Sequence, residues 1–181
     1  MKMDLAVLKT LREQTGLSVN ECRLALESSG GDPGKAREFL QKRHVQLAQK
    51  RQGKATTEGR LGSYLHHDGR LAALVEVNCE SDYVARTEEF QKFCKDVAMQ
   101  VAAMSPRYLS LKEVPSTGGQ NQNTEALKAA CLLEQPFVRD SGVTIHELLQ
   151  ALIAKTGEQV VIQRFVRVAV GESTHASEQP A

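Results

Sequence analysis

The pattern of apolar residues changes at Leu61, and this change limits what the chain can fold into more than any other feature. Up to that point apolar residues recur every three or four positions, which is the period of an amphipathic helix. Residues 61–77 then form two β-rich runs around Asp68-Gly69, a pair typical of a two-residue type I′ turn, in which both central residues need positive φ. The sequence therefore predicts a helical module followed by a hairpin and a sheet.

Residues 1–55 are predicted to form three helices and a basic linker. The first helix, residues 4–15, is amphipathic and stops at Gly16. Ser18 and Glu21 then have the spacing of a capping box, in which the serine side chain accepts a bond from the glutamate amide and the glutamate reaches back. The second helix is therefore expected to begin at this serine.

The third helix is marked at both of its ends. Gly30-Gly31 ends the second helix, and Asp32-Pro33 supplies an N-cap and a first-turn proline for the next one. Residues 41–54 extend this helix with five basic residues and no acid, which we interpret as a solvated helix end and linker. The residues expected to be buried are Ala36, Phe39 and Leu40.

Residues 56–171 are predicted to form an α+β module, a small antiparallel sheet covered by helices. Thr87 is a candidate N-cap for a long helix, and a shorter helix is expected from Glu125 to Glu134. A capping box at 144–147 opens a further helix, and residues 159–170 alternate like a strand. The buried stripe expected on the long helix comprises Phe90, Phe93, Cys94, Val97, Val101 and Met104. Residues 114–123 are predicted to be a loop, and 172–181 a flexible tail.

Composition indicates a soluble cytoplasmic protein. Hydrophobic residues make up 41% and charged residues 25%, close to the globular average. No apolar run approaches the roughly 18 residues that a membrane span needs, and the charged N-terminus does not resemble a signal peptide. The cysteines lack a CxxC pair, which argues against a zinc knuckle or a disulfide framework and favours reduced, buried thiols: Cys22, Cys79, Cys94 and Cys131.

An enzymatic interpretation has little support in the local spacing of reactive residues. Cys79 with His66 or His67 as its base matches no known nucleophile pattern. A metal site formed by the two histidines with Glu80 and Asp82 lacks a ligand pattern as well. The adjacent histidines are expected to lie in a strand and to point to opposite faces, so that both could not bind one ion without distortion. We therefore expect no covalent catalysis and no bound metal.

Direct binding of nucleotides or nucleic acids is also disfavoured. Gly30-Gly31 and Gly118-Gly119 lack the lysine and strand of a phosphate loop, so we expect no nucleotide or other cofactor. Residues 1–60 carry 12 basic against 7 acidic side chains, but the whole chain has a net charge of only +1. The basic segment 42–60 also lacks aromatic residues for base stacking. A module that binds another protein is the remaining class.

Three segments carry a resemblance to a known family. The first two, "LREQTGLSVNECRLAL" (residues 11–26) and "EVNCESDYVAR" (76–86), resemble in the same order the two signature segments of the elongation factor Ts family. The third is "LLEQPFVRDSGVTIHELLQALIAKTGEQVVIQRFVRV" (132–168), and the length is similar to the family's short form. The resemblance implies an N-terminal three-helix, ubiquitin-associated-like domain followed by one core domain.

The resemblance also implies a function and a partner. Members of the family are guanine-nucleotide exchange factors that bind elongation factor Tu, accelerate GDP release and let GTP enter. Such a factor needs no cofactor and no covalent step, and the resemblance leaves room for a homodimer. The alternative is an accessory protein that binds a G domain or RNA and has weakened exchange activity.

Site residues follow from the same resemblance. Ser81, Asp82, Tyr83 and Val84 match the group that the family pushes into the partner's G domain near its magnesium ion. A plainer interpretation is that Ser81 and Asp82 only cap the next helix and Tyr83 fills core. The expected docking residues, around the start of the second helix, are Val19, Asn20, Cys22 and Arg23.

The chain departs from the family's pattern in several places. Arg23 stands where the family usually has lysine, Ser81 where it has threonine, and Tyr83 where it has phenylalanine. The added phenol oxygen of Tyr83 needs a hydrogen-bond partner wherever it becomes buried. The stretch between Val114 and Cys131 is shorter than the family's usual helical insert.

Overall fold

The computed structural model describes residues 5–15, 17–115 and 124–172. The predicted helix stop at Gly16, most of the predicted loop at 114–123 and all but the first residue of the predicted tail lie outside the described residues. The chain divides into two compact units. One unit comprises residues up to Lys54 together with Gln150–Gln159, and the other comprises Ala55–Leu149 and the chain from Val160 onward. Residues 150–159, which the sequence analysis assigned to the sheet module, thus group with the helices.

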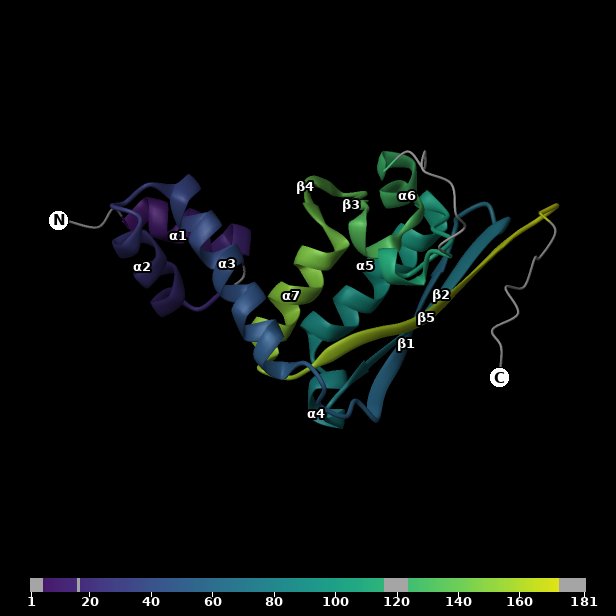
Figure 1. The fold of residues 1–181 in the computed structure, drawn as a ribbon, viewed down its shortest axis with the longest axis horizontal. Helices are drawn as coiled ribbons and strands as arrows, with labels where there is room; N and C mark the ends of the chain where they lie inside the picture. Colours follow the sequence, from purple (N-terminus) through teal and green to yellow (C-terminus); the bar gives the residue numbers. More distant parts are fainter. Residues whose placement is uncertain (1–4, 16, 116–123, 173–181) are drawn as a thin grey trace. The chain divides into compact units, whose positions relative to one another are not determined.

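The N-terminal part of the first unit contains three helices: α1 (Leu5–Thr15), α2 (Val19–Ser28) and α3 (Pro33–Arg51). They pack on one another, as Figure 1 shows in its purple and blue segments. Each contributes apolar residues at helical spacing, so the three faces close around one small core. Its buried members are Leu8, Leu11, Leu17, Cys22, Ala25, Leu26, Ala36 and Leu40.

Local signals fix the start and end of α2 and the start of α3 as predicted. The Ser18 side chain accepts a hydrogen bond from the Glu21 amide, and the Glu21 carboxylate accepts one from the Ser18 amide, which completes the capping box. The Asp32 carboxylate accepts from the Lys35 amide at 3.0 Å. After α2, Gly31 adopts a φ of +87° and its amide donates to the Leu26 carbonyl at 2.8 Å.

The predicted burial of Phe39 is wrong, because 37% of the residue is exposed. With 3.6 residues per turn, Phe39 lies about 100° around α3 from Leu40. Ala36 and Leu40 are almost fully buried and fill the stripe that faces the other helices. The apolar face of α3 is therefore narrower than its sequence suggested.

A three-stranded antiparallel sheet organises the second unit, in the order β1 (Glu58–Leu65), β2 (Leu71–Cys79), β5 (Val160–Ala169). Helix α5 (Glu88–Met104) begins at the predicted cap Thr87 and covers one face of this sheet (Figure 1). A Cβ atom added at Gly62 would lie 2.4 Å from the Cys94 carbonyl oxygen, so strand β1 approaches the α5 backbone closely. The stripe on α5 is buried as predicted except at Met104, which is 45% exposed at the last turn.

The hairpin between β1 and β2 forms where predicted, but its turn is different. The His66 amide donates to the Leu71 carbonyl, so four residues, 67–70, rather than two lie between the last bonded pair. Gly69 alone in this turn has a positive φ, +70°, whereas a type I′ turn needs two. The Asp68 carboxylate accepts from the Arg70 amide at 2.9 Å, a local bond that stabilises the longer loop.

Among the described residues, 107–115 and 124–144 differ most from their prediction. Helix α6 (Thr124–Ala130) ends early, because Cys131 takes an extended conformation and pairs with Tyr108. The 3-10 turns η1 (Leu111–Glu113) and η2 (Leu132–Glu134) and the small hairpin of β3 (Pro136–Phe137) and β4 (Asp140–Thr144) were not predicted. The capping box at Thr144 and Glu147 is confirmed and opens α7 (Ile145–Thr156).

A buried pair of amides anchors this region to α5. The Gln100 side-chain nitrogen donates to the side-chain oxygen of Gln135 at 3.0 Å, and the Gln100 side-chain oxygen accepts from the Val138 backbone amide at 2.8 Å. The Gln135 amide nitrogen in turn donates to the Ala129 carbonyl. Both glutamines are almost fully buried, and their bonds fix a segment that has little regular structure.

Candidate partner-binding surfaces

A tight turn at the end of β2 positions the four residues predicted to enter the partner's G domain, residues 81–84. Ser81 is the N-cap of the one-turn helix α4 (Asp82–Ala85), and its hydroxyl accepts a hydrogen bond from the Val84 amide at 3.3 Å. The Cys79 thiol, at the last position of the strand, donates to the Ser81 carbonyl at 3.1 Å. The backbone of the turn is therefore held on both sides of Ser81.

The side chains of α4 separate into an inner and an outer set. Val84 and Ala85 are buried, and α4 packs on β1, β2 and α5. Tyr83 points outward and is 77% exposed, so the interpretation that it fills core is wrong. An exposed aromatic ring on a short helix with an anchored backbone is the most unusual feature of this turn, because large rings are usually at least partly buried.

Charged groups flank the exposed ring. The Asp82 carboxylate pairs with the Arg86 guanidinium at 2.8 Å, one helical turn later, and both side chains are mostly in solvent. The Thr87 hydroxyl donates to the Val84 carbonyl, and the side-chain nitrogen of Gln91 donates to the Arg86 carbonyl. These two bonds connect α4 to the start of α5. Exposed pairs of this kind are weak, so the carboxylate can exchange Arg86 for another partner at little cost.

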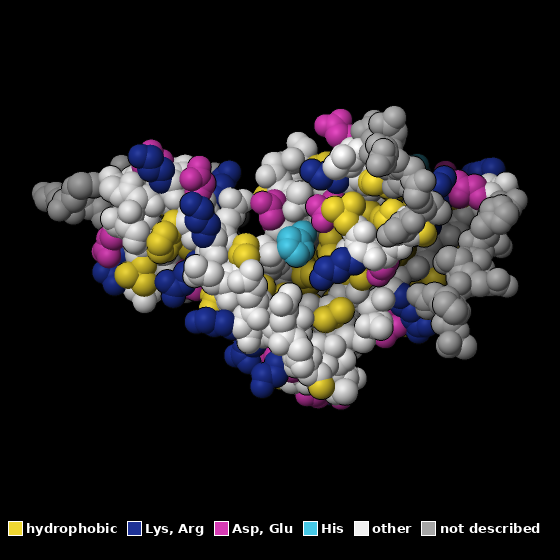
Figure 2. All heavy atoms as spheres, viewed as in Figure 1, with side chains coloured by type: hydrophobic (Ala, Val, Ile, Leu, Met, Phe, Trp, Pro, Cys, Tyr) yellow, Lys and Arg dark blue, Asp and Glu magenta, His cyan; other side chains and the backbone are white. Residues whose placement is uncertain are grey.

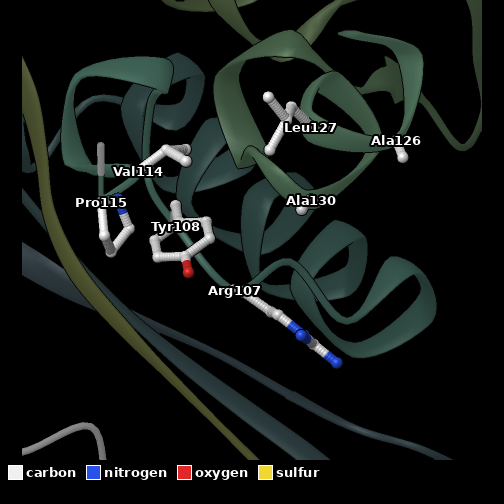
Figure 3. A pocket seen from close by; sticks show the side chains of 7 residues that line it. All are labelled: Arg107, Tyr108, Val114, Pro115, Ala126, Leu127 and Ala130. Carbon is white, nitrogen blue, oxygen red and sulfur yellow. The ribbon is translucent and has the colours of Figure 1, made fainter. Parts of the chain in front are cut away.

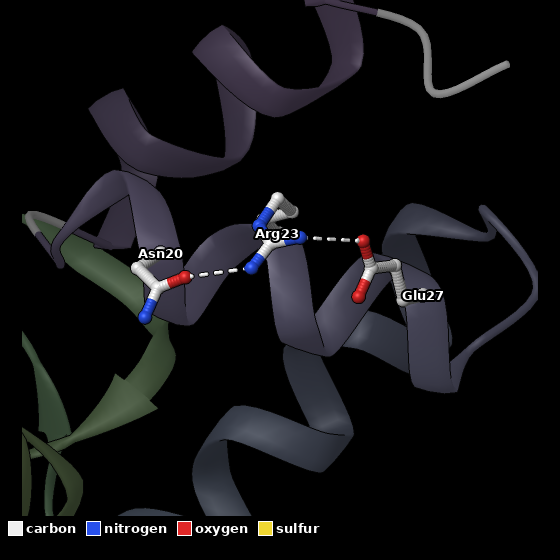
Figure 4. A network of polar contacts seen from close by, with 3 residues as sticks. All are labelled: Asn20, Arg23 and Glu27. Atoms are coloured by element: carbon white, nitrogen blue, oxygen red, sulfur yellow. Dashed lines mark hydrogen bonds and ion pairs between the residues drawn. The ribbon is translucent and has the colours of Figure 1, made fainter.

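The predicted docking residues lie on α2, in the helical unit. Val19 is 48% exposed at the first turn, and Asn20 and Arg23 are exposed on the same helix. Figure 4 shows Arg23 between Asn20 and Glu27, bonded to both. The Asn20 amide oxygen and the Glu27 carboxylate accept from the two terminal nitrogens of Arg23, and Glu27 is a residue that the sequence analysis did not single out.

Two of the predicted contact residues have no surface to offer. Cys22 is fully buried in the core of the helical unit, and only 5% of Val84 is exposed. Their side chains support α2 and α4 from inside and cannot touch a partner in this conformation. Helical spacing contains this information, because Cys22 lies one turn before Leu26, which belongs to the same core.

The structure offers little support for catalysis by the cysteines and histidines. Burial raises the pKa of Cys94 to about 12, so its thiol stays protonated. Cys79 is buried and its thiol is engaged with a carbonyl. The expectation that His66 and His67 point to opposite faces is wrong, because both follow β1 in the turn with ring centroids 4.3 Å apart. Within the described ranges, no three His, Cys, Asp or Glu side chains form a group that could hold a metal ion.

A cavity of about 500 Å³ lies beside α6 in the second unit (Figure 3). Its walls are largely apolar, and Arg107 and Tyr108 supply the polar groups. None of these lining residues carries a carboxylate, imidazole or thiol, and the phenol of Tyr108 has no such group among them to act as its partner in acid–base or nucleophilic chemistry. The apolar lining comprises Val114, Pro115, Ala126, Leu127 and Ala130.

Comparison with known proteins identifies the family. Residues 35–124 match the family model described as elongation factor TS. The elongation factor Ts of Methylacidiphilum infernorum is 39% identical over 193 residues, covering 94% of this chain and 96% of that protein. The chain belongs to the elongation factor Ts family. The elongation factor Ts of Moorella thermoacetica is also 39% identical, with 96% and 98% of the two chains covered.

Membership in the family makes the chain a translation elongation factor. The matches cover the two candidate surfaces to different extents. The family model covers the turn with Ser81 and Tyr83 but begins after α2. The relatives span nearly the whole of both chains, so α2 is also part of the shared architecture. In the part of the chain that the structure describes, no helix is long and apolar enough to cross a bilayer.

Proposed function

We propose that this elongation factor Ts family member binds elongation factor Tu carrying GDP and promotes release of the nucleotide. The observation that carries the proposal is the exposed ring of Tyr83 beside Asp82, on a helix whose backbone is anchored at Ser81. A group held in this way can enter another protein without first rearranging its own backbone. Pre-organisation of this kind lowers the cost of binding.

The proposed target of Asp82 and Tyr83 is the magnesium and phosphate site of the partner. A bound GDP is held there by Mg²⁺, which bridges phosphate oxygens to hydroxyl and carboxylate ligands. A ring and a negative charge inserted nearby can displace the elements that hold the ion, and loss of the ion weakens the grip on phosphate. Tight binding of the factor and weak binding of the nucleotide are then one reciprocal coupling free energy, and no covalent step is needed.

Docking on the partner's G domain is assigned to α2. Val19 offers an apolar contact, and Asn20 and Arg23 offer hydrogen-bond donors beside it. We include neither Cys22 nor Val84 among the contacts, because both are buried. The capping box of Ser18 fixes the first turn of α2, which defines the direction in which these side chains point.

A homodimer is a second part of the proposal. The sheet face opposite α5 is exposed and largely apolar, with Leu74 paired to Val166 and Ala72 to Val168 across β2 and β5. A second copy is the occupant that fits, because two such faces can pack as the layers of a β-sandwich about a two-fold axis. Leu74→Lys should shift the chain toward the monomer in sedimentation equilibrium. The other exposed apolar members of the face are Leu61, Leu65 and Val170.

An RNA-binding accessory role is the alternative. Its support is the basic half of α3, where Figure 2 shows dark-blue Lys and Arg side chains at several points. RNA binding would fall steeply with salt, whereas an exchange factor binds nucleotide-free elongation factor Tu tightly. Stopped-flow release of a fluorescent GDP analogue from elongation factor Tu, with and without the chain, tests the proposal. Faster release supports exchange activity, and an unchanged rate together with salt-sensitive RNA binding overturns it.

A further inference from the structure

The three side chains drawn in Figure 4 form a stripe along α2, made of Asn20, Arg23 and Glu27. Arg23 donates from one terminal nitrogen to the Asn20 amide oxygen at 3.0 Å and from the other to the Glu27 carboxylate at 3.1 Å. The residues are three and four positions apart, which places them on one face of the helix. All three are exposed, so the stripe is available to a partner.

We propose that Glu27 is a positioning residue of this stripe, and that the stripe recognises neutral hydrogen-bond acceptors on the partner rather than a cluster of acids. The inference rests on the proposed docking of α2 on elongation factor Tu. It goes beyond that docking, because it assigns a role to Glu27 and states what chemistry the matching patch must present.

The geometry determines which groups are left for a partner. A guanidinium has five N–H donors, and two of its nitrogens are each committed to one bond within the stripe. The Asn20 oxygen faces Arg23, so its amide nitrogen points away from the stripe (Figure 4), and its two donors make no bond to any residue that the structure describes. The partner therefore meets a row of oriented donors next to the apolar side chain of Val19.

The charge of the stripe argues against the simplest alternative, a cluster of acids on the partner. Arg23 and Glu27 carry opposite charges and form an ion pair, so the stripe has no net charge. A cluster of acids on the partner would be attracted by Arg23 and repelled by Glu27 at nearly the same distance. Backbone carbonyls and side-chain amides of the partner have no such conflict and can accept from the donors that remain.

Glu27 contributes little to the fold by itself, because exposed ion pairs one helical turn apart are weak. Its effect should appear on binding, since an unanchored arginine loses rotamer freedom when it docks. Loss of one such restraint corresponds to a decrease in affinity of about fivefold. Arginine suits this arrangement, because its planar fork reaches two acceptors at once and a lysine ammonium does not have that shape.

The test compares the affinity of the full chain and its variants for nucleotide-free elongation factor Tu at low and high salt. Glu27→Ala removes both the charge and the acceptor, whereas Glu27→Gln keeps an acceptor for Arg23. At high salt we expect Glu27→Ala to bind about fivefold more weakly and Glu27→Gln to stay within about twofold of wild type. Neither variant should make association much more dependent on salt, because the patch proposed to face Arg23 carries no cluster of charges.

A matched control is available on α1. Lys9 and Glu13 form an exposed ion pair with the same four-residue spacing, so Glu13→Ala should leave affinity unchanged. If Glu27→Ala binds like wild type, or if Glu27→Ala and Glu27→Gln bind equally weakly at high salt, the positioning role is wrong. The proposed function fails separately, if the wild-type chain itself neither binds elongation factor Tu nor accelerates GDP release.

Discussion

The exposed turn at Tyr83 and the stripe on α2 hold their functional side chains in opposite ways. At the turn, the backbone is anchored by Ser81 and Cys79 while the ring of Tyr83 is free in solvent. On α2, the side chains hold one another, and Arg23 is bonded on two sides. A side chain that has to enter the partner must extend away from its own surface, whereas a side chain that has to match hydrogen-bonding groups on the partner needs a fixed orientation. We therefore expect the turn to control the rate of nucleotide release and the stripe to control affinity.

The largest effect should come from Asp82→Ala combined with Tyr83→Ala. Both side chains are exposed, so the fold and the docking surface should remain, while the maximal rate of stimulated GDP release falls by about 100-fold or more, equivalent to roughly 2.7 kcal/mol. Stopped-flow release at saturating concentrations of the double variant measures this rate. A wild-type rate in excess Mg²⁺ would mean that the strand end is only a helix cap.

Removal of magnesium sharpens the same prediction. If the turn acts by displacing the ion, EDTA should recover much of the deficit of the double variant, because that step is then already complete. Tyr83→Phe is the conservative control and should be neutral or mildly favourable. The phenol oxygen that this change removes would cost about 1–3 kcal/mol if it were buried in the partner without a hydrogen bond.

Gly62→Ala should disturb the turn that carries Tyr83 and leave the stripe on α2 unchanged. The added Cβ would meet the Cys94 backbone at 2.4 Å, so α5 has to move away from β1, and α4 packs on both elements. We expect a loss of about 2–3 kcal/mol in the free energy of unfolding. Chemical denaturation measures the loss, and Ser63→Ala, on the exposed side of the same strand, is the control. Equal stability of the two variants would contradict the close packing.

Val19→Ala should weaken affinity and leave the maximal release rate intact. An exposed apolar residue that becomes buried in an interface can contribute about 1–1.5 kcal/mol, close to a tenfold change in Kd. Titration of the variant against elongation factor Tu separates the two parameters. A lower maximal rate with unchanged half-saturation would reverse the roles that we assign to the two surfaces.

Acid should destabilise the helical unit through His44. Its Nε2 atom is buried with no hydrogen-bond partner among the described residues, and burial lowers the pKa of this imidazole, against an opposing effect of Glu21. The unfolded chain therefore takes up a proton first, and stability falls as the pH drops below about 6.5. In the other unit, burial raises the pKa of Asp96, which acts in the opposite direction at more acidic pH.

Unfolding followed by circular dichroism between about pH 7.5 and pH 5.5 measures this dependence. His44→Gln should flatten it, and His67→Gln, in the exposed turn of the hairpin, should not. An unchanged slope in His44→Gln would locate the acid sensitivity elsewhere.

The smallest effect is expected from the basic half of α3. Changing Lys42, Arg43 and Lys50 to Gln should leave exchange within about twofold of wild type at moderate salt, with slower association at low salt. Release rates measured at two ionic strengths separate these effects. Complete loss of exchange at moderate salt would show that this face is part of the docking surface.

The sequence predicted the elements whose signals are local. Capping residues such as Ser18, Asp32, Thr87 and Thr144 bond as expected, because each acts within three residues of itself. The segment from 107 to 144 was predicted poorly. Its conformation depends on contacts distant in sequence, such as Gln100 with Gln135, and no periodicity records them.

The candidate site shows the same division. The family resemblance predicts Asp82, Tyr83 and Val84 as site residues, but only the structure shows that Tyr83 is exposed and Val84 buried. A four-residue helix is too short to carry a readable amphipathic pattern. Glu27 was missed because its pairing with Arg23 is one of many compatible spacings on a helix, and side-chain geometry decides which of them forms.

Exposure of Tyr83 also gives the molecule an intrinsic chemical label. The chain contains no tryptophan and three tyrosines. The hydroxyl of Tyr64 is bonded to His66, and Tyr108 is partly covered in the wall of a cavity. Reagents that nitrate or iodinate phenols should therefore reach Tyr83 first. The ring proposed to enter elongation factor Tu can thus be modified and followed by absorbance in the natural sequence, with no reporter residue introduced.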